Sequence, residues 1–288
     1  MAGSGSLVRL AIQVDRDCAE LVLAELLELA PNGVEEVDVS DELIEYAVYG
    51  APGELPSLPD LEAVAGGALV HVSTSEVAGD WATRWREFHR PLVLGDRLTV
   101  RPPWEPPGST ALEVVIDPGQ AFGTGAHPTT RLCLELLLSE AGAGGDGPGP
   151  GGDGPGSCVD LGCGSGVLAI TAALLGFSPV LALDFDPAAV DACVSNAAAN
   201  GVSIDVRRFD LRSEQAPDGD LVVANVLAPP LLAWAGLQVA LPRRLVLSGL
   251  LVGEADRVAS AYAARGMVLA ESRCDGEWAA LLLTLPRS

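Results

Sequence analysis

The chain contains no lysine. All 17 of its basic residues are arginine, against 39 aspartate and glutamate residues, and the formal net charge is −22. A surface this acidic repels phosphate backbones, so the composition counts against RNA or DNA as a general partner. It can attract a basic protein through complementary fields, although an acidic surface that is merely solvated explains the charge equally well.

Long apolar runs, paired cysteines and a secretory leader are also missing. The chain is 49% apolar, but none of its uninterrupted apolar runs approaches the length of a membrane helix. The first six residues, Met-Ala-Gly-Ser-Gly-Ser, lack the charged-then-apolar layout of a secretory signal. The six cysteines form no CxxC pair, and their spacing fits neither a zinc site nor a disulfide framework. We therefore expect free thiols in the reducing cytoplasm, with no metal and no membrane contact.

The patterns that are present predict two domains, which 288 residues are enough to form. Residues 1–75 predict a small α+β unit with one long helix at 16–29. Its strands are expected at 7–13, 34–39, 43–49 and 68–74, with a short helix near 58–65. Residues 76–109 are expected to connect the domains through a helix at 76–90 and a stiff proline-rich segment around Trp104.

From residue 110 to 288 the pattern alternates between strand and helix, which predicts an α/β fold with a doubly wound, mostly parallel sheet. Strands are expected at 112–116, 157–161, 179–184, 203–207, 220–225, 243–248, 266–272 and 278–284, and helices at 129–140, 166–175, 187–199, 228–240 and 253–264. The last two strands should form a hairpin through Asp275-Gly276 and place an antiparallel strand at the edge. Nine glycines and three prolines at 142–156 predict a flexible insertion.

A glycine-rich turn carries most of the functional information. Residues 158–166 read Cys-Val-Asp-Leu-Gly-Cys-Gly-Ser-Gly, between an expected strand and an expected helix. Gly162, Gly164 and Gly166 let the backbone turn tightly and approach a ligand, and the helix N-terminus offers N–H groups to an anion. A tight structural turn is the alternative. The dinucleotide fingerprint has its third glycine one residue later, so the spacing fits S-adenosylmethionine better than a dinucleotide.

Acidic residues near this turn support a nucleoside site. Asp184 closes the second strand, at the edge where open α/β sheets bind ligands, and its carboxylate can accept both ribose hydroxyls. Asp160 and Asp184 would together place negative charge near a cationic cofactor. Asp210, after the third strand, is placed to meet the adenine edge. Asp186, directly before Pro187, is expected to cap the next helix.

Two more segments bear on catalysis. Asn225 follows the strand at 220–225, where its amide oxygen can orient an incoming amine; a helix cap or turn is the alternative role. The segment Phe122-Gly-Thr-Gly-Ala-His-Pro-Thr-Thr predicts a shaped loop before a helix, with Thr129 as the cap. This loop can fold over the cofactor as a lid, with Phe122 and Gly123 in contact with it. His127 within it is either a general base or a structural hydrogen-bond partner.

These segments, in this order, resemble the ribosomal protein L11 methyltransferase family, PrmA. The most specific match is Ala-Phe-Gly-Thr-Gly-Ala-His-Pro-Thr-Thr-Arg-Leu-Cys-Leu-Glu at 121–135. Matches of a kind shared by many methyltransferases are Asp-Leu-Gly-Cys-Gly-Ser-Gly-Val-Leu-Ala-Ile at 160–170, Leu-Asp-Phe-Asp-Pro at 183–187 and Ala-Asn-Val-Leu-Ala at 224–228. Strong resemblance covers about residues 81–288, whereas residues 1–75 match only in size and α+β character.

The resemblance implies that residues 110–288 are a class I, Rossmann-like methyltransferase domain with a seven-stranded sheet, and that residues 1–75 recognise the substrate. Thr130, Gly162, Asp184 and Asn225 match the family's cofactor-contacting positions. The implied reaction transfers methyl groups from S-adenosylmethionine to lysine and N-terminal amines of a basic ribosomal protein. We expect Asn225 to align a neutral amine for in-line displacement, without a metal or a covalent intermediate. The insertion at 142–156 departs from the family pattern.

Three rival functions remain open at this point. The first is an S-adenosylmethionine-dependent enzyme acting on another protein, a small molecule or a nucleic acid, of which the last is disfavoured by the charge. The second is an NAD(P)-dependent oxidoreductase, against which the third glycine's position argues. The third is a binding protein that keeps the fold and the cofactor without catalysing methyl transfer.

Overall fold

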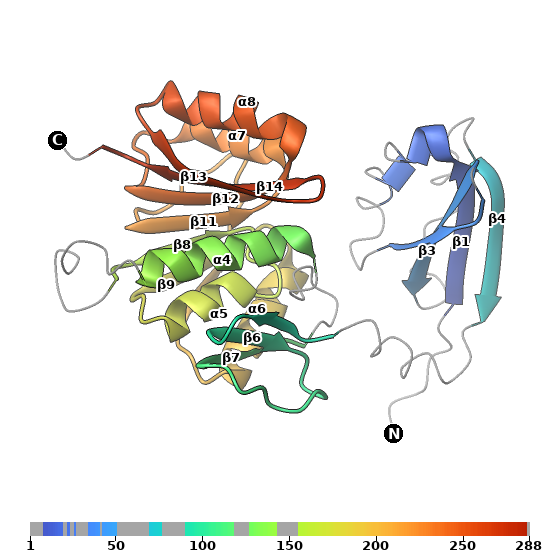
Figure 1. Cartoon of the computed structure of the whole chain (residues 1–288), viewed down its shortest axis with the longest axis horizontal. Helices are drawn as coiled ribbons and strands as arrows, with labels where there is room; N and C mark the ends of the chain where they lie inside the picture. Colours follow the sequence, from blue (N-terminus) through green and yellow to red (C-terminus); the bar gives the residue numbers. More distant parts are fainter. Residues whose placement is uncertain are drawn as a thin grey trace. The chain divides into compact units, whose positions relative to one another are not determined.

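The computed structural model describes residues 8–19, 22–23, 26, 34–40, 42–50, 69–76, 90–117, 127–142 and 155–286. The chain divides into two compact units, Met1–Phe88 and His89–Ser288 (Figure 1). The helix expected near 58–65, residues 77–89 of the helix expected at 76–90, and residues 143–154 of the insertion lie outside the described residues. Within the described ranges, no helix is both long enough and apolar enough to span a membrane.

The first unit contains a four-stranded antiparallel sheet in the order β2-β3-β1-β4. Its elements are β1 Val8–Asp15, the short 3₁₀ helix η1 Arg16–Cys18, β2 Glu35–Asp38, β3 Leu43–Gly50 and β4 Leu69–Glu76. Alternate residues of β1 and β3 point to one face, as the period of a strand requires. There they form a buried cluster with the residues at 19, 22 and 26. The hydroxyl of Tyr46 donates to the carbonyl of Ala19 at 3.1 Å. All four expected strands are confirmed.

A seven-stranded sheet forms the centre of the second unit, in the order β10-β9-β8-β11-β12-β14-β13. Its strands are β8 Cys158–Leu161, β9 Val180–Asp184, β10 Asp205–Arg208, β11 Leu221–Asn225, β12 Arg244–Leu251, β13 Val268–Asp275 and β14 Trp278–Thr284. The first five strands of that order pair in parallel. The direction of winding reverses between β8 and β11, which is the position where open α/β sheets bind ligands.

The antiparallel strand lies inside the sheet, so its expected place at the edge was wrong. β13 and β14 form the predicted hairpin, but β14 inserts between β12 and β13 and pairs antiparallel with both. β14 is apolar along nearly its whole length and is buried, whereas β13 alternates with charged residues and is mostly exposed. A strand that is apolar on both faces is suited to a central position, and the mixed strand is suited to the edge.

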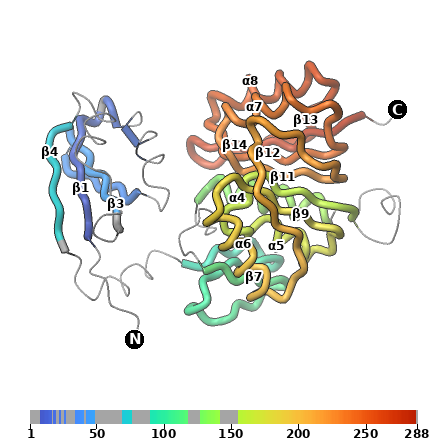
Figure 2. The backbone as a smooth tube through the Cα atoms, turned by 180° about the vertical axis from the view of Figure 1, so that it is seen from behind, coloured from blue at the N-terminus to red at the C-terminus, as the bar shows by residue number. Residues whose placement is uncertain are grey.

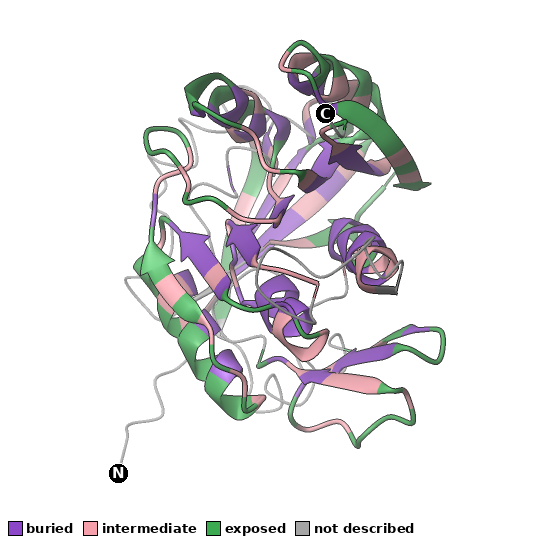
Figure 3. Cartoon of the chain, turned by 90° about the vertical axis from the view of Figure 1, so that its left-hand side faces the viewer, coloured by how far each residue is buried: buried purple, intermediate pink, exposed green. Residues whose placement is uncertain are grey.

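Five helices cover the two faces of this sheet: α4 Pro128–Gly142, α5 Val167–Leu174, α6 Pro187–Ala199, α7 Ala228–Leu237 and α8 Val252–Ala263. Residues of α4, α5 and α6 join one hydrophobic cluster, and residues of α7 and α8 join the cluster on the opposite face. The buried strands lie between helices whose outer sides are exposed (Figure 3). The doubly wound α/β fold is therefore confirmed.

A separate three-stranded sheet precedes α4. Its strands are β5 Leu92–Leu94, β6 Leu98–Arg101 and β7 Leu112–Val115. The strand at 112–116 is confirmed, but its expected place in the doubly wound alternation was wrong, because β7 pairs with β6. The expected connector at 76–109 also carries β5 and β6, which the proline-rich composition concealed. Their buried side chains join the cluster of α4 and α5, so this small sheet packs with the second unit.

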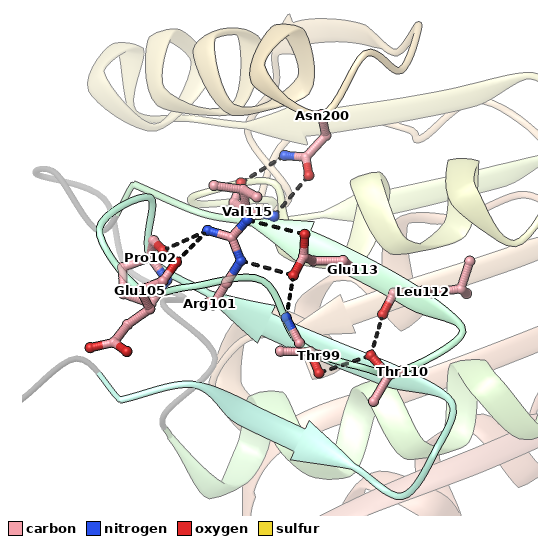
Figure 4. Close-up of polar contacts among 10 residues, drawn as sticks. Thr99, Arg101, Pro102, Glu105, Thr110, Leu112, Glu113, Val115 and Asn200 are labelled. Carbon is pink, nitrogen blue, oxygen red and sulfur yellow. Dashed lines mark hydrogen bonds and ion pairs between the residues drawn. The ribbon is translucent and has the colours of Figure 1, made fainter.

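Arg101 fixes the proline-rich segment between β6 and β7 (Figure 4). Its guanidinium donates to both carboxylate oxygens of Glu113, at 2.9 and 3.1 Å. It also donates to the carbonyls of Pro102 and Glu105. A planar guanidinium can satisfy several acceptors at once, so one side chain joins the turn to β7.

Candidate active site

The glycine turn joins β8 to α5 with three residues in the left-handed region: Gly162, Gly164 and Gly166 have φ of +73°, +52° and +84°. The amide N–H of Gly162 donates to the carbonyl of Leu183 at 2.7 Å, which ties the turn to the end of β9. A Cβ at Gly162 would lie 2.4 Å from Cγ1 of Val226, directly after β11. Only glycine meets both the backbone conformation and this close approach.

Asp184 lies at the end of β9 and contacts the glycine turn. One carboxylate oxygen accepts the amide N–H of Gly164 at 2.9 Å, and the other accepts that of Asp186 at 3.0 Å. The side chain is nearly buried, and burial raises its pKa while the backbone hydrogen bonds oppose the rise. The backbone N–H of Phe185 also bonds to this carboxylate. A carboxylate has about four acceptor positions, so capacity for a ligand hydroxyl remains, as the ribose role expected for Asp184 requires.

Asp160 lies beneath the same turn, in β8, and is fully buried. One of its oxygens accepts the amide N–H of Ala169 in the first turn of α5 at 3.0 Å. The other oxygen has no hydrogen-bond partner among the described residues. Burial raises the pKa of Asp160 to about 7. The structure thus gives this carboxyl a helix-capping role that the sequence did not reveal, and its contact with a cofactor stays a prediction.

Asn225 ends β11 and presents an unused acceptor. Its amide nitrogen donates to the hydroxyl of Thr130 at 3.1 Å, whereas its buried Oδ1 has no hydrogen-bond partner in the described part of the chain. Leaving a buried acceptor unpaired costs about 1–3 kcal/mol. An oxygen kept in this state is suited to a hydrogen-bond donor supplied by a ligand. The pair also joins β11 to α4, although 95 residues separate the two positions.

The start of α4 differs from the sequence expectation. The helix begins at Pro128 rather than after Thr129, so Thr129 is not the cap. Instead, the amide N–H of Thr129 donates to Nδ1 of His127 at 3.3 Å, and the Thr129 hydroxyl lies 2.7 Å from the same nitrogen. The His127 ring also contacts Trp278 edge-on, with centroids 4.9 Å apart. Burial lowers the pKa of His127. These contacts favour the structural role over the general base.

Two other acidic residues lie near the end of β9. Asp186 caps α6 as predicted, by accepting the amide N–H of Ala188 at 2.9 Å. Asp210 follows β10, and its carboxylate accepts from the backbone and side chain of Arg212. These bonds lower the pKa of Asp210. Its contact with adenine therefore stays a prediction, because in the structure this carboxylate faces an arginine.

The cysteines give no sign of nucleophilic chemistry. All six lie within the described residues and are unpaired, as expected. A hydrogen bond with Cys193, together with burial, raises the pKa of the Cys163 thiol within the glycine turn. Burial likewise raises the pKa of Cys133. A nucleophilic cysteine needs the opposite shift. In the described ranges, no three His, Cys, Asp or Glu side chains gather as a metal site requires.

The structure brings together four of the predicted elements at one edge of the sheet: the glycine turn, Asp184, Asn225 and Thr130. Phe122 and Gly123 lie outside the described residues. Sequence reasoning missed Phe185, an aromatic side chain directly after Asp184 that is 60% exposed. The guanidinium carbon of Arg212 lies 5.7 Å from the centroid of this ring, so a base could stack on the ring only on the face that Arg212 does not cover. Its position directly after Asp184 in the sequence was the available signal.

Comparison with known proteins agrees with this geometry. Residues 57–285 match the model of the family described as Ribosomal protein L11 methyltransferase (PrmA). The chain belongs to this family. The matched range includes the glycine turn, Asp184 and Asn225.

Relatives in this family are similar over different lengths. A ribosomal protein L11 methyltransferase of Geobacter metallireducens is 40% identical over 210 residues, which cover 70% of this chain and 65% of the relative. A protein of the same name from Pseudomonas aeruginosa is 36% identical over 284 residues, which cover 89% of this chain and 90% of the relative. The chain aligns with 60–65% of the length of five relatives, including the one from Geobacter, and with 90% of the length of three others.

A solved structure supports the fold. The crystal structure of a ribosomal protein L11 methylase from Lactobacillus delbrueckii subsp. bulgaricus matches with a TM-score of 0.57. The match covers 69% of this chain and all of the other chain, at 24% sequence identity. At this level of identity the likeness establishes the shared fold alone.

Proposed function

We propose that this chain transfers methyl groups from S-adenosylmethionine to amino groups of ribosomal protein L11. The observation that carries the proposal is the buried, unpartnered Oδ1 of Asn225, at the reversal of the sheet beside the glycine turn. Family membership and the names of the relatives support the same activity. The protein substrate fits an acidic chain, since ribosomal proteins that bind RNA carry basic surfaces.

The residues present fit S-adenosylmethionine on structural grounds. The site combines a left-handed glycine turn, which lets a ligand approach the backbone, with the carboxylate of Asp184, which can accept hydroxyl donors. Phe185 offers an exposed ring to a base. Gly166 is the N-cap of α5 and supplies no side chain there, whereas Asp160 accepts the N–H of Ala169. An anionic group such as a carboxylate would therefore meet the N–H groups that precede Ala169.

When bound, S-adenosylmethionine supplies a methyl group activated by its sulfonium. The chain's own residues have the task of binding and aligning the acceptor amine. Asn225 can accept a hydrogen from a neutral amine through Oδ1, because its amide nitrogen is already held by Thr130. That bond fixes the orientation of the amide and keeps the acceptor oxygen toward the site. The amine must first lose a proton, which burial near the apolar end of β11 would favour.

The substrate is tested with labelled S-adenosylmethionine and ribosomal proteins purified from a strain that lacks this gene. We expect one labelled protein, with the mass of ribosomal protein L11, and label on amino groups. Ribosomes from the parent strain, already methylated, serve as the control and should take up little label. A labelled protein of different mass would show that the substrate is not ribosomal protein L11. Absence of label from every fraction would refute the methyltransferase activity.

Asn225→Ala tests the role of the amide within that assay. We expect turnover to fall about 100-fold, the scale on which a lost transition-state contact acts. The dissociation constant of S-adenosylmethionine should change far less, because the proposed contact is with the amine. Gln238→Ala is the matched control, since Gln238 is also a buried amide but caps the far end of α7. Unchanged turnover in Asn225→Ala would exclude this role.

A further inference from the structure

A second buried amide, Asn196 on α6, joins two parts of the site that are distant in sequence. Its side chain is 3% exposed. The amide nitrogen donates to the carbonyl of Ser165 at 2.9 Å, and the amide oxygen accepts the N–H of Asp117 at 3.1 Å. Ser165 is the residue between Gly164 and Gly166, so Asn196 holds the glycine turn at its centre. Asp117 follows β7 and precedes the 121–135 motif in the sequence.

Asn200, one helical turn later, forms a matching contact that does not reach the glycine turn. Its amide nitrogen donates to the carbonyl of Val115 at 2.7 Å, and its amide oxygen accepts the N–H of the same residue at 2.8 Å (Figure 4). α6 and β7 lie next to each other in the view from behind (Figure 2). Side chains four residues apart share one face of a helix. That face of α6 therefore holds the end of β7 at two points, through Asn200 and Asn196.

The contact of Asn196 adds to the bonds that hold the first half of the turn. The N–H groups of Gly162 and Gly164 donate to the end of β9, whereas Asn196 binds the carbonyl of Ser165 from α6. The residues on both sides of Ser165 are glycines with positive φ, and glycine has the widest choice of backbone conformations. Cys193 of the same helix also packs against the turn, and its Sγ would lie 2.6 Å from a Cβ at Gly166. An amide can donate to one carbonyl and accept from one N–H at once, which a carboxylate or an aliphatic side chain cannot do.

We infer that Asn196 is a positioning residue for the S-adenosylmethionine site, which holds the 162–166 turn in its ligand-binding conformation. This inference rests on the proposed function. Asn196 does not touch the reacting atoms and acts through the carbonyl of Ser165. Its second bond, to the N–H of Asp117, connects the turn to the segment that directly follows β7.

The test compares Asn196→Asp with Asn200→Asp in the full-length chain. Asn196→Asp keeps the acceptor for Asp117 but replaces the donor to Ser165 with a carboxylate oxygen. We expect the dissociation constant of S-adenosylmethionine, measured by calorimetry, to rise about 10- to 100-fold, as the loss of a buried hydrogen bond predicts. Asn200→Asp also puts a carboxylate on α6, but it should leave that constant within about twofold of the wild type, because it does not contact the turn.

Hydrogen exchange without ligand distinguishes positioning from general destabilisation. In Asn196→Asp the peptide that spans 160–168 should exchange faster than in the wild type, and in Asn200→Asp it should not. Asn196→Ala, which removes both bonds without adding a charge, should behave like Asn196→Asp and replaces it if that variant does not fold. Wild-type affinity in a folded Asn196 variant, or an equal loss in Asn200→Asp, would overturn the inference. A wild-type chain that does not bind S-adenosylmethionine would instead refute the proposed function.

Discussion

The buried carboxyl of Asp160 makes a quantitative prediction about stability and pH. Its pKa is raised from the ordinary aspartate value of 3.8 to about 7, because burial disfavours the charged form. Between these two values the folded chain holds a proton on Asp160 that the unfolded chain has released. The contribution of Asp160 to folding stability must therefore fall as the pH rises through this interval, and this contribution should be nearly constant on either side of it.

The size of the effect follows from the interval. At about 1.4 kcal/mol for each pH unit, three units correspond to a loss of about 4 kcal/mol between about pH 4 and about pH 7. Single domains are stable by only about 5–15 kcal/mol, so this loss should be easy to measure. Asp184 contributes in the same direction, because burial raises its pKa too. The contribution of Asp160 is therefore measured as the difference from a variant.

Asp160→Asn removes the titrating group and retains an oxygen for the amide N–H of Ala169. The variant carries a buried amide donor that destabilises the fold by the same amount at every pH. The comparison therefore uses the change of the unfolding free energy with pH rather than its absolute value. Urea denaturation followed by circular dichroism from about pH 4 to about pH 8 gives both curves. We expect the wild type to lose stability with rising pH, and the variant to lose about 4 kcal/mol less over the same range.

Asp220→Asn is the matched control. Asp220 accepts the backbone N–H and the hydroxyl of Ser157, each at 2.8 Å, and these bonds lower its pKa. Its contribution to stability is present above the ordinary value of 3.8 and is lost as the pH falls toward the lowered folded-state pKa, which is opposite in sign to that of Asp160. Parallel curves for the wild type and Asp160→Asn would refute the assignment of a raised pKa to Asp160.

Two further predictions concern the residues around the site. Thr130→Val leaves the amide nitrogen of Asn225 without its acceptor, so turnover should fall about 10-fold because the amide is misoriented. Thr130→Ser keeps the hydroxyl and should retain most of the activity. Equal turnover in the two variants would contradict the role of the hydroxyl. Gly166→Ala forces an L-residue to φ of +84° and places a methyl group 2.6 Å from the sulfur of Cys193. Left-handed strain of about 1–2 kcal/mol and overpacking of about 1–3 kcal/mol should together lower the unfolding free energy by about 2–5 kcal/mol. Adding Cys193→Ala should recover only the overpacking part, and a loss below about 1 kcal/mol in the single variant would show that the turn adapts.

Much of the fold could be predicted because local patterns carry it. The alternation of apolar runs and helical periods placed every strand of the seven-stranded sheet and every helix around it to within a few residues. The pairing of strands could not be obtained this way, since pairing joins residues that are far apart in sequence. The antiparallel strand β14 was assigned to the edge for this reason, and β7 was assigned to the wrong sheet. Strands β5 and β6 were not predicted because prolines flank them. Proline disfavours strands locally, but tertiary packing can outweigh such local preferences.

The candidate site could likewise be predicted only in part from the sequence. Glycine spacing, the acidic residue at the end of the second strand and the asparagine at the end of the fourth were enough to predict a nucleoside site, because the carboxyl ends of parallel strands meet at one edge. The hydrogen bonds that distinguish the roles of these residues are long-range. Thr130 with Asn225, Asp160 with the first turn of α5, and Asn196 with Ser165 each depend on how helices pack against the sheet.

The sequence by itself therefore determined the kinds of secondary structure, the family and the identity of the polar groups at the sheet edge, because these follow from residue types at fixed spacing. Only the tertiary structure decided which buried groups are satisfied. It paired one end of the Asn225 amide and left the other unpaired, and it placed the Asp160 carboxyl out of reach of water. Burial and hydrogen bonding are properties of the packed chain. They determine that Oδ1 of Asn225 is an unpaired acceptor and that the pKa of Asp160 is raised.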